Sequence, residues 1–225
     1  MTRLFRRRIR RVLVDIDTQY DLFNHSAQDI TVLLRRIRRL MAWARVQHIP
    51  VISTALARPR PENNVIPPGS LNNCMEGTFG QRKISYTQLP TRIRFGAENR
   101  LDLPRNLLGQ YQQIIFEKRT EDPFAHPRAD RLLTELKIEE FILFGMGIDK
   151  AIKAAALGLL YRRKQVLIVT DAVNSADRRT TIMSLRQMEA KGARLVTTES
   201  LTGKSRLVGP VVLKSPPASV LSNSR

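Results

Sequence analysis

The sequence has little cysteine, few aromatic residues and no long apolar run. One cysteine in 225 residues excludes a disulfide framework and any multi-thiolate metal site. No apolar run approaches the ~20 residues that a membrane-spanning helix needs, so we predict no membrane span. Aromatic residues make up 6% of the chain and do not alternate with the basic runs, which argues against base stacking. These absences favour a cytoplasmic protein. Hydrophobic residues, at 42%, are numerous enough to build a core.

Acidic residues are scarce as well: 38 Lys and Arg stand against 20 Asp and Glu, for a formal net charge of +18. The excess is concentrated at the ends, because residues 1–11 hold six arginines and no acid, and residues 203–225 hold four basic residues and no acid. That leaves +8 for residues 12–202. We therefore predict a basic arm over 1–11, a folded domain over 12–202 and a flexible basic tail containing Ser and Pro over 203–225.

The basic arms suggest a contact with nucleic acid or an acidic protein. In the first arm the residues concerned are Arg6, Arg7, Arg8, Arg10 and Arg11, and a second cluster lies at 35–39. Arginines that neutralise several phosphates give a salt-dependent affinity that ignores sequence. A solvated basic surface is the alternative interpretation. An Arg-rich start is also typical of a mitochondrial presequence, but a strand pattern that begins at Val12 leaves too little room for one.

Hydrophobic periodicity predicts alternating strands and helices. Apolar and β-branched runs predict strands at 11–17, 50–54, 113–117, 140–145, 165–170 and 193–197. Apolar residues at helical spacing predict helices at 28–47, 127–136, 150–161 and 178–191. Residues 55–110 are rich in proline and glycine and are predicted to be irregular. The alternation predicts an α/β fold: a doubly wound, mainly parallel sheet of about six strands flanked by helices, a Rossmann-like three-layer sandwich.

Ligands bind such sheets at the carboxyl ends of the strands, and this sequence has distinctive residues there. The motifs are Asp-Thr-Gln-Tyr-Asp-Leu-Phe at 17–23, Asn-Cys-Met-Glu-Gly-Thr-Phe-Gly at 73–80, Lys118, and Gly-Met-Gly-Ile-Asp at 145–149. In this order they resemble the cysteine hydrolase superfamily of isochorismatase-like proteins and nicotinamidases. That family has D-x-Q-x-D-F after its first strand, H-C-x-x-G-T-x-G in its long loop, a Lys after its third strand and G-x-x-T-D-x-C-V after its fourth. The resemblance covers about residues 12–200 and implies the isochorismatase-like fold.

The resemblance also implies which residues form the site. Asp17 and Lys118 match two members of the family's catalytic set, and Gln19, Phe23 and Asp149 match residues of its pocket. We expect Asp17 and Lys118 to form an ion pair, and two interpretations of it stay open: the two residues neutralise each other and close the pocket, or they form a retained recognition site for a small polar ligand.

The sequence departs from the family at the nucleophile. The resemblance places the catalytic cysteine two residues after Asp149, at a helix N-terminus, and the residue there is Ala151. Alanine has no atom that attacks a carbonyl, and residues 145–156 contain no Ser, Thr or Cys. The family also has a cis peptide that orients its oxyanion-hole amides; by position it lies between Gly147 and Ile148. Ile148 stands where the family has Thr, a second departure.

Neither a metal nor a cofactor is predicted. Family members that bind a metal use a D-x-H sequence after the second strand and the His of the loop motif. Here those positions hold Thr54-Ala55-Leu56 and Asn73, and the three histidines of the chain lack ligand spacing. Cys74 lies where the family often has a non-catalytic cysteine, so we interpret it as a structural thiol.

These features favour a catalytically degenerate protein of this family, a pseudoenzyme that binds a ligand or supports an assembly. Two alternatives stay open: an active hydrolase of an amide or vinyl ether that uses Asp17 and Lys118 with another nucleophile or a water, and a polyanion-binding protein that acts through its basic arms. The resemblance also implies a homo-oligomer formed through helices beside the sheet. The small residues of 151–161 suit that packing.

Overall fold

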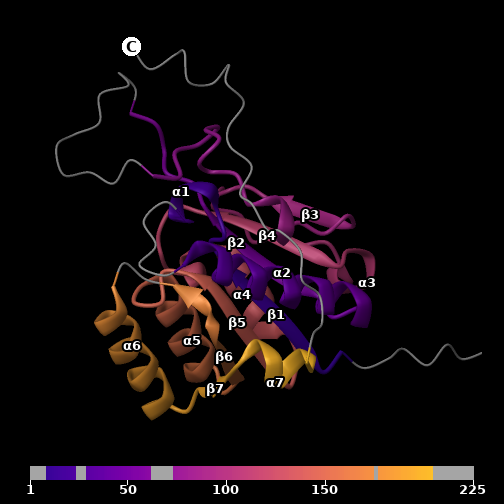
Figure 1. The fold of residues 1–225 in the computed structure, drawn as a ribbon. Helices are drawn as coiled ribbons and strands as arrows, with labels where there is room; N and C mark the ends of the chain where they lie inside the picture. The colour runs from indigo at the N-terminus through magenta and orange to yellow at the C-terminus, as the bar shows by residue number, and fades with distance from the viewer. Residues whose placement is uncertain (1–8, 24–28, 62–72, 175–176, 205–225) are drawn as a thin grey trace, which may run out of the picture.

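Seven parallel strands form a single sheet at the centre of the molecule (Figure 1). The computed structural model describes residues 9–23, 29–61, 73–174 and 177–204, so Arg6, Arg7, Arg8 and nearly all of the predicted tail lie outside the described residues. The strands are β1 (Arg11–Ile16), β2 (Val51–Leu56), β3 (Arg92–Phe95), β4 (Gln113–Lys118), β5 (Glu140–Met146), β6 (Gln165–Asn174) and β7 (Arg194–Val196). All six predicted strands are present, and the α/β fold with a parallel sheet is confirmed.

The strand order is β3-β4-β2-β1-β5-β6-β7, and every pairing is parallel. After β1 the chain forms β2, β3 and β4 on one side of it, with β3 at the edge and β4 between β3 and β2. The strands β5, β6 and β7 then follow on the other side of β1. This doubly wound order puts a topological switch point beside β1, where the carboxyl ends of the strands leave a crevice for ligands.

The additional strand, β3, lies within the stretch predicted to be irregular. It is short and forms one edge of the sheet, where it pairs with β4. Its side chains alternate between exposed arginines and half-buried Ile93 and Phe95. Four residues with alternating charge do not produce the apolar run that marks a buried central strand, which is why the sequence did not reveal it.

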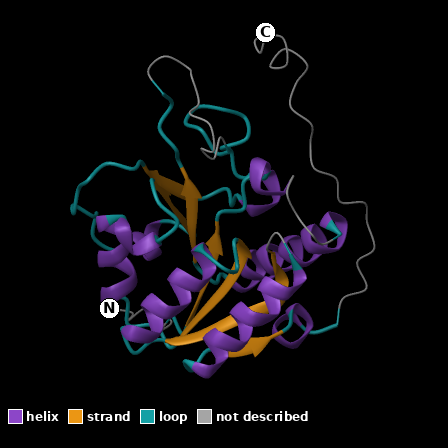
Figure 2. Cartoon of the chain, turned by 90° about the vertical axis from the view of Figure 1, so that its left-hand side faces the viewer, coloured by secondary structure: helices purple, strands orange, loops and turns teal. Residues whose placement is uncertain are grey.

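Helices cover both faces of the sheet (Figure 2). The longer ones are α2 (Ile30–Gln47), α4 (Pro127–Glu135), α5 (Ala151–Tyr161) and α6 (Arg178–Ala190). The short elements are α1 (Tyr20–Phe23), α3 (Leu107–Gln110), α7 (Thr198–Thr202) and the 3₁₀ turns η1 (Ser85–Thr87) and η2 (Pro123–Ala125). None of the helices in the described part of the chain is long and apolar enough to cross a membrane.

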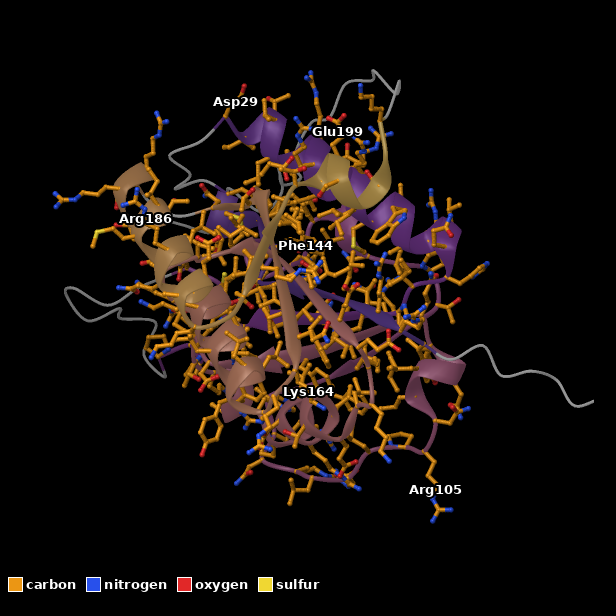
Figure 3. The ribbon with its side chains drawn as sticks, turned by 90° about the horizontal axis from the view of Figure 1, so that it is seen from below. Asp29, Arg105, Phe144, Lys164, Arg186 and Glu199 are labelled. Atoms are coloured by element: carbon orange, nitrogen blue, oxygen red, sulfur yellow. The ribbon has the colours of Figure 1, made fainter. Side chains whose placement is uncertain are left out.

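Two hydrophobic cores lie on the two faces. Alternate residues of the strands pack under α4, α5 and α6 on one face and under α2 on the other. Phe144 of β5 lies in the interior on the α2 face, whereas Arg105 and Arg186 point outward (Figure 3). On α5, Ala155 and Ala156 are buried in the core of their own domain, so these small residues are already used within the chain. The predicted homo-oligomer stays a prediction.

Candidate active site

Asp17 and Lys118 meet at the carboxyl edge of the sheet. Asp17 follows β1 directly and has a positive φ of 50°, a conformation that turns the chain sharply away from the strand. Lys118 is the last residue of β4, and β2 lies between the two strands. The Lys118 Nζ and Asp17 Oδ2 atoms are 2.6 Å apart, and both side chains are 1% exposed. The sequence places both residues at strand ends, and the fold joins them as an ion pair.

The hydrogen bonds of this pair are satisfied within the chain. The Lys118 ammonium donates to Asp17 and to the carbonyl oxygens of Thr120 and Glu121, both at 3.1 Å. The second Asp17 oxygen accepts a bond of 2.6 Å from the Thr54 hydroxyl. An ammonium group has three donors. Lys118 therefore keeps no donor for a bound ligand unless one of these contacts is given up.

A second buried ion pair lies beside the first, and the sequence motifs did not predict it. Lys83 Nζ is 2.9 Å from Asp15 Oδ2, and both side chains are fully buried. Lys83 also donates to the Thr18 hydroxyl at 2.9 Å and to the Thr54 carbonyl at 3.1 Å. Thr54 thus contacts both ion pairs, because its hydroxyl binds Asp17. The pair fastens the long segment before β3 to the middle of the sheet.

Neutral polar groups complete this network. Ser53 donates to Asp15 at 2.8 Å, and the Gln113 amide donates to Ser53 at 2.8 Å and to the Thr87 carbonyl at 2.7 Å. An unpaired buried charge is costly, and these bonds leave the Asp15 carboxylate fully paired. The one sequence signal was Asp15 itself, a carboxylate within an otherwise apolar strand. Its partner, 68 residues away in an irregular segment, had no signal at all.

The N-terminus of α5 differs from the expected arrangement. Ala151 is its first residue and is 1% exposed, so a methyl group occupies the position that the resemblance gives to the nucleophile. The peptide bond between Gly147 and Ile148 is trans, as are all others in the described residues, so the expected cis bond is not formed. The Ile148 amide donates to the Asn174 carbonyl at 3.0 Å. Gly147 adopts a φ of 71°, which lets the chain turn into α5 with a trans bond. The Ile148 amide is therefore not a free oxyanion-hole donor.

The other predicted pocket residues have mixed surroundings. Gln19 is buried, and its amide bonds to both backbone groups of Leu56 and to the Gln81 carbonyl, at 2.6–2.7 Å. Phe23 is fully buried in the apolar core under α2. Asp149 lies half-buried in the turn between β5 and α5. Gln19 and Phe23 therefore fasten the chain, and only Asp149 keeps partial access to solvent.

Cys74 is an inert, buried thiol. Burial, together with the carboxylates of Asp21 and Asp17, raises its pKa from 9.0 to about 12. Its backbone has a positive φ of 55°, and its amide donates to Asp21 at 2.7 Å, which holds the loop beside α1. Since the thiolate is the nucleophilic form, Cys74 is not a displaced catalytic cysteine at neutral pH.

Two further predictions concern metals and the basic arm. No cluster of three or more His, Cys, Asp or Glu residues suited to a metal ion occurs within residues 9–23, 29–61, 73–174 and 177–204.

Of the arginines predicted as polyanion contacts, the structure describes Arg10 and Arg11. They form ion pairs with Glu139 at 2.8 Å and Glu140 at 2.5 Å, respectively. Their charges are therefore partly neutralised by the domain itself.

Comparison with known proteins decides the family. The family model described as the isochorismatase domain matches residues 11–200. The chain belongs to the isochorismatase family. This confirms the resemblance drawn from the strand-end motifs. No curated protein matches the chain.

Solved structures of isochorismatase-like proteins share the fold at low sequence identity. The MAR1 ribonuclease of Caenorhabditis elegans is 21% identical, with a TM-score of 0.60 over 86% of this chain and 80% of that one. The nicotinamidase PncA of Bacillus subtilis is 18% identical, with a TM-score of 0.60, and the match covers 83% of this chain and 98% of that one. The N-carbamoylsarcosine amidase of Thermoplasma acidophilum is 18% identical, with a TM-score of 0.59, and the match covers 84% of this chain and 97% of that one. Neighbours this distant establish the isochorismatase-like fold and leave the activity open.

Proposed function

We propose that this chain is a catalytically degenerate isochorismatase-like protein that binds a small polar ligand or supports an assembly without hydrolysing a substrate. The observation that carries the proposal is Ala151. In this family the cysteine at that position attacks the substrate, and the Ala151 methyl group at the start of α5 has no lone pair to do so.

The remaining groups of the site support the same proposal. The Asp17 carboxylate and the Lys118 ammonium bind each other, and their other hydrogen bonds go to Thr54, Thr120 and Glu121. A general base needs a lone pair directed at the proton it removes; each Asp17 oxygen already accepts one hydrogen bond, and the side chain is only 1% exposed. An activated water would have to reach this buried carboxylate.

The test is hydrolysis of a panel of small primary amides and vinyl ethers by the full-length chain, the Asp17→Asn variant and the Lys118→Ala variant. We expect release of ammonia or pyruvate to be the same for all three proteins and equal to the rate without protein. Turnover by the wild type that vanishes in Asp17→Asn would overturn the proposal in favour of a hydrolase with another nucleophile or a water. The panel includes nicotinamide and N-carbamoylsarcosine, after which two of the structural neighbours are named.

A second candidate function, nucleic-acid binding, is supported by the net charge of +18 and by the ribonuclease among the structural neighbours. The arm residues Arg10 and Arg11 are paired with acids, so the arm alone is a weak basis for it. Binding of a labelled oligonucleotide by the full chain, compared with a chain that lacks residues 1–11 and 203–225, tests the version that depends on the arms. Equal binding by both chains would rule that version out.

A further inference from the structure

A groove lies on the α2 face of the molecule, away from the Asp17–Lys118 pair. It has a volume of about 280 Å³ and is formed by α2 and the segment around η1. We call it the α2–η1 groove; its lining includes Arg38, Met41, Arg45, Tyr86, Gln88 and Leu89. No Asp or Glu lines it. The groove therefore combines two cations, an aromatic ring and an apolar floor.

The charges of α2 are unusual because they are not neutralised. The helix contains five arginines, and in the described part of the chain only Arg36 forms an ion pair, with Asp171 at 3.3 Å. Arg38 and Arg45 are exposed and have no carboxylate within ion-pair distance among the described residues. Elsewhere arginines are commonly paired. Examples are Arg94 with Glu117, Arg128 with Asp102, Arg131 with Glu135 and Arg162 with Asp130.

The fold adds an aromatic side chain to these cations. Tyr86 of η1 is half-buried beside α2, and the Arg38 guanidinium lies 5.5 Å from the centre of its ring. The two residues are 48 positions apart in the sequence, so aromatic and basic residues do not interleave along the chain. In the folded protein they share one groove.

We propose that the α2–η1 groove binds single-stranded nucleic acid without sequence preference. Arg38 and Arg45 are seven residues apart, or about 10 Å along the helix at 1.5 Å per residue, so they lie on the same side two turns apart and contact successive backbone phosphates. When the Arg38 guanidinium moves from the Tyr86 ring to a phosphate, the ring stacks on an unpaired base in a groove that Met41 and Leu89 also line. A base paired within a duplex has no face open for such stacking, so the strand is single. An acidic peptide would use the arginines but not the ring.

This inference does not rest on the proposed loss of hydrolysis, since it uses none of the residues at the carboxyl edge of the sheet. It also differs from a contact made by the arms, because Arg38, Arg45 and Tyr86 all belong to the folded domain.

The experiment is fluorescence anisotropy of a labelled single-stranded oligonucleotide titrated with the full-length chain over a range of salt concentrations. Arg38→Gln combined with Arg45→Gln removes two phosphate contacts. We expect the slope of log K against log [salt] to become less negative by about 1.4, at roughly 0.7 per contact for single strands. Arg100→Gln combined with Arg131→Gln is the matched control, because it removes two exposed, paired arginines from another surface. We expect this control to keep the wild-type slope.

The ring is tested separately. Tyr86→Leu is expected to weaken binding about 5- to 150-fold, the range for loss of one base stack, and Tyr86→Phe to restore it. Competition with polyglutamate and with a duplex of the same sequence identifies the ligand class. Equal effects of the two arginine pairs, or unchanged affinity in Tyr86→Leu, would overturn the proposal and leave only non-specific attraction by net charge. Stronger competition by polyglutamate than by unlabelled single strand would overturn it in favour of an acidic protein partner.

Discussion

The carboxyl edge of the sheet and the α2–η1 groove differ in the burial and the pairing of their charged side chains. At the carboxyl edge and just beneath it, Lys118 and Lys83 are buried, and each is bound to a carboxylate at 2.6 and 2.9 Å. On α2, Arg38 and Arg45 are exposed and form no ion pair within the described residues. Buried pairs that satisfy each other fix a structure, whereas exposed unpaired charges are available to a partner. Both buried lysines here are held by carboxylates of the chain itself, which supports a structural role for these pairs.

The largest expected effect comes from breaking a buried pair. Lys83→Met leaves the Asp15 carboxylate buried without its counter-ion, and we expect the free energy of unfolding to fall by about 3–5 kcal/mol. Urea denaturation followed by circular dichroism measures the change. Arg100→Met, which removes one side of an exposed pair with Asp102, is the control and should cost less than about 1 kcal/mol. Equal losses in the two variants would show that burial does not distinguish the two pairs.

A smaller effect concerns the buried thiol beside Asp21. Because the pKa of Cys74 rises from 9.0 to about 12 on folding, the folded state holds this proton more tightly than the unfolded state. Stability from this group is therefore complete below pH 9 and declines as the pH rises toward 12, by up to about 1.4 kcal/mol per pH unit. Urea unfolding of the wild type and of Cys74→Ala between pH 9 and pH 11 isolates the contribution. We expect a steeper decline in the wild type; parallel curves would contradict the raised pKa.

The smallest expected effect lies in the groove. Arg38→Gln combined with Arg45→Gln removes two exposed charges and the contact of Arg38 with the Tyr86 ring, so the free energy of unfolding should change by less than about 1 kcal/mol. The same urea experiment checks it. A loss above about 1.5 kcal/mol would mean that these arginines support the fold, and the contrast between the two regions would fail.

The sequence predicted the sheet well where strands are central and apolar. Runs such as Phe141–Phe144 are buried on both faces of the sheet, so their composition alone identifies them. The edge strand β3 was missed because half of its short run is exposed arginine. The meeting of Asp17 with Lys118 was anticipated because both residues follow strands whose carboxyl ends share one edge.

The rest of the two sites depends on contacts between distant segments. Lys83 and Tyr86 both lie in the stretch that the sequence marks only as irregular. Hydrophobic periodicity says nothing about where such a segment packs, so neither the pairing of Lys83 with Asp15 nor the position of Tyr86 beside Arg38 was predictable. The cis peptide expected at Gly147 came from the family pattern, and the local sequence, with Ile148 in place of Thr, takes a trans turn instead.

The most direct test of the account is the pKa of a thiol introduced by Ala151→Cys. Position 151 is the first residue of α5, where a side chain meets the positive end of the helix dipole. A helix N-terminus stabilises a thiolate and burial opposes it, so we expect the introduced thiol to titrate below an equally buried thiol further along α5 when thiolate absorbance is followed against pH. Cys74, with a pKa of about 12, does not interfere. Ala155→Cys, one turn further along α5 and, like Ala151, 1% exposed, is the matched control and should titrate at a higher pH. A thiol in Ala151→Cys that titrates at or above the value for Ala155→Cys would contradict the view that this position keeps the environment of a nucleophile and lacks its sulfur.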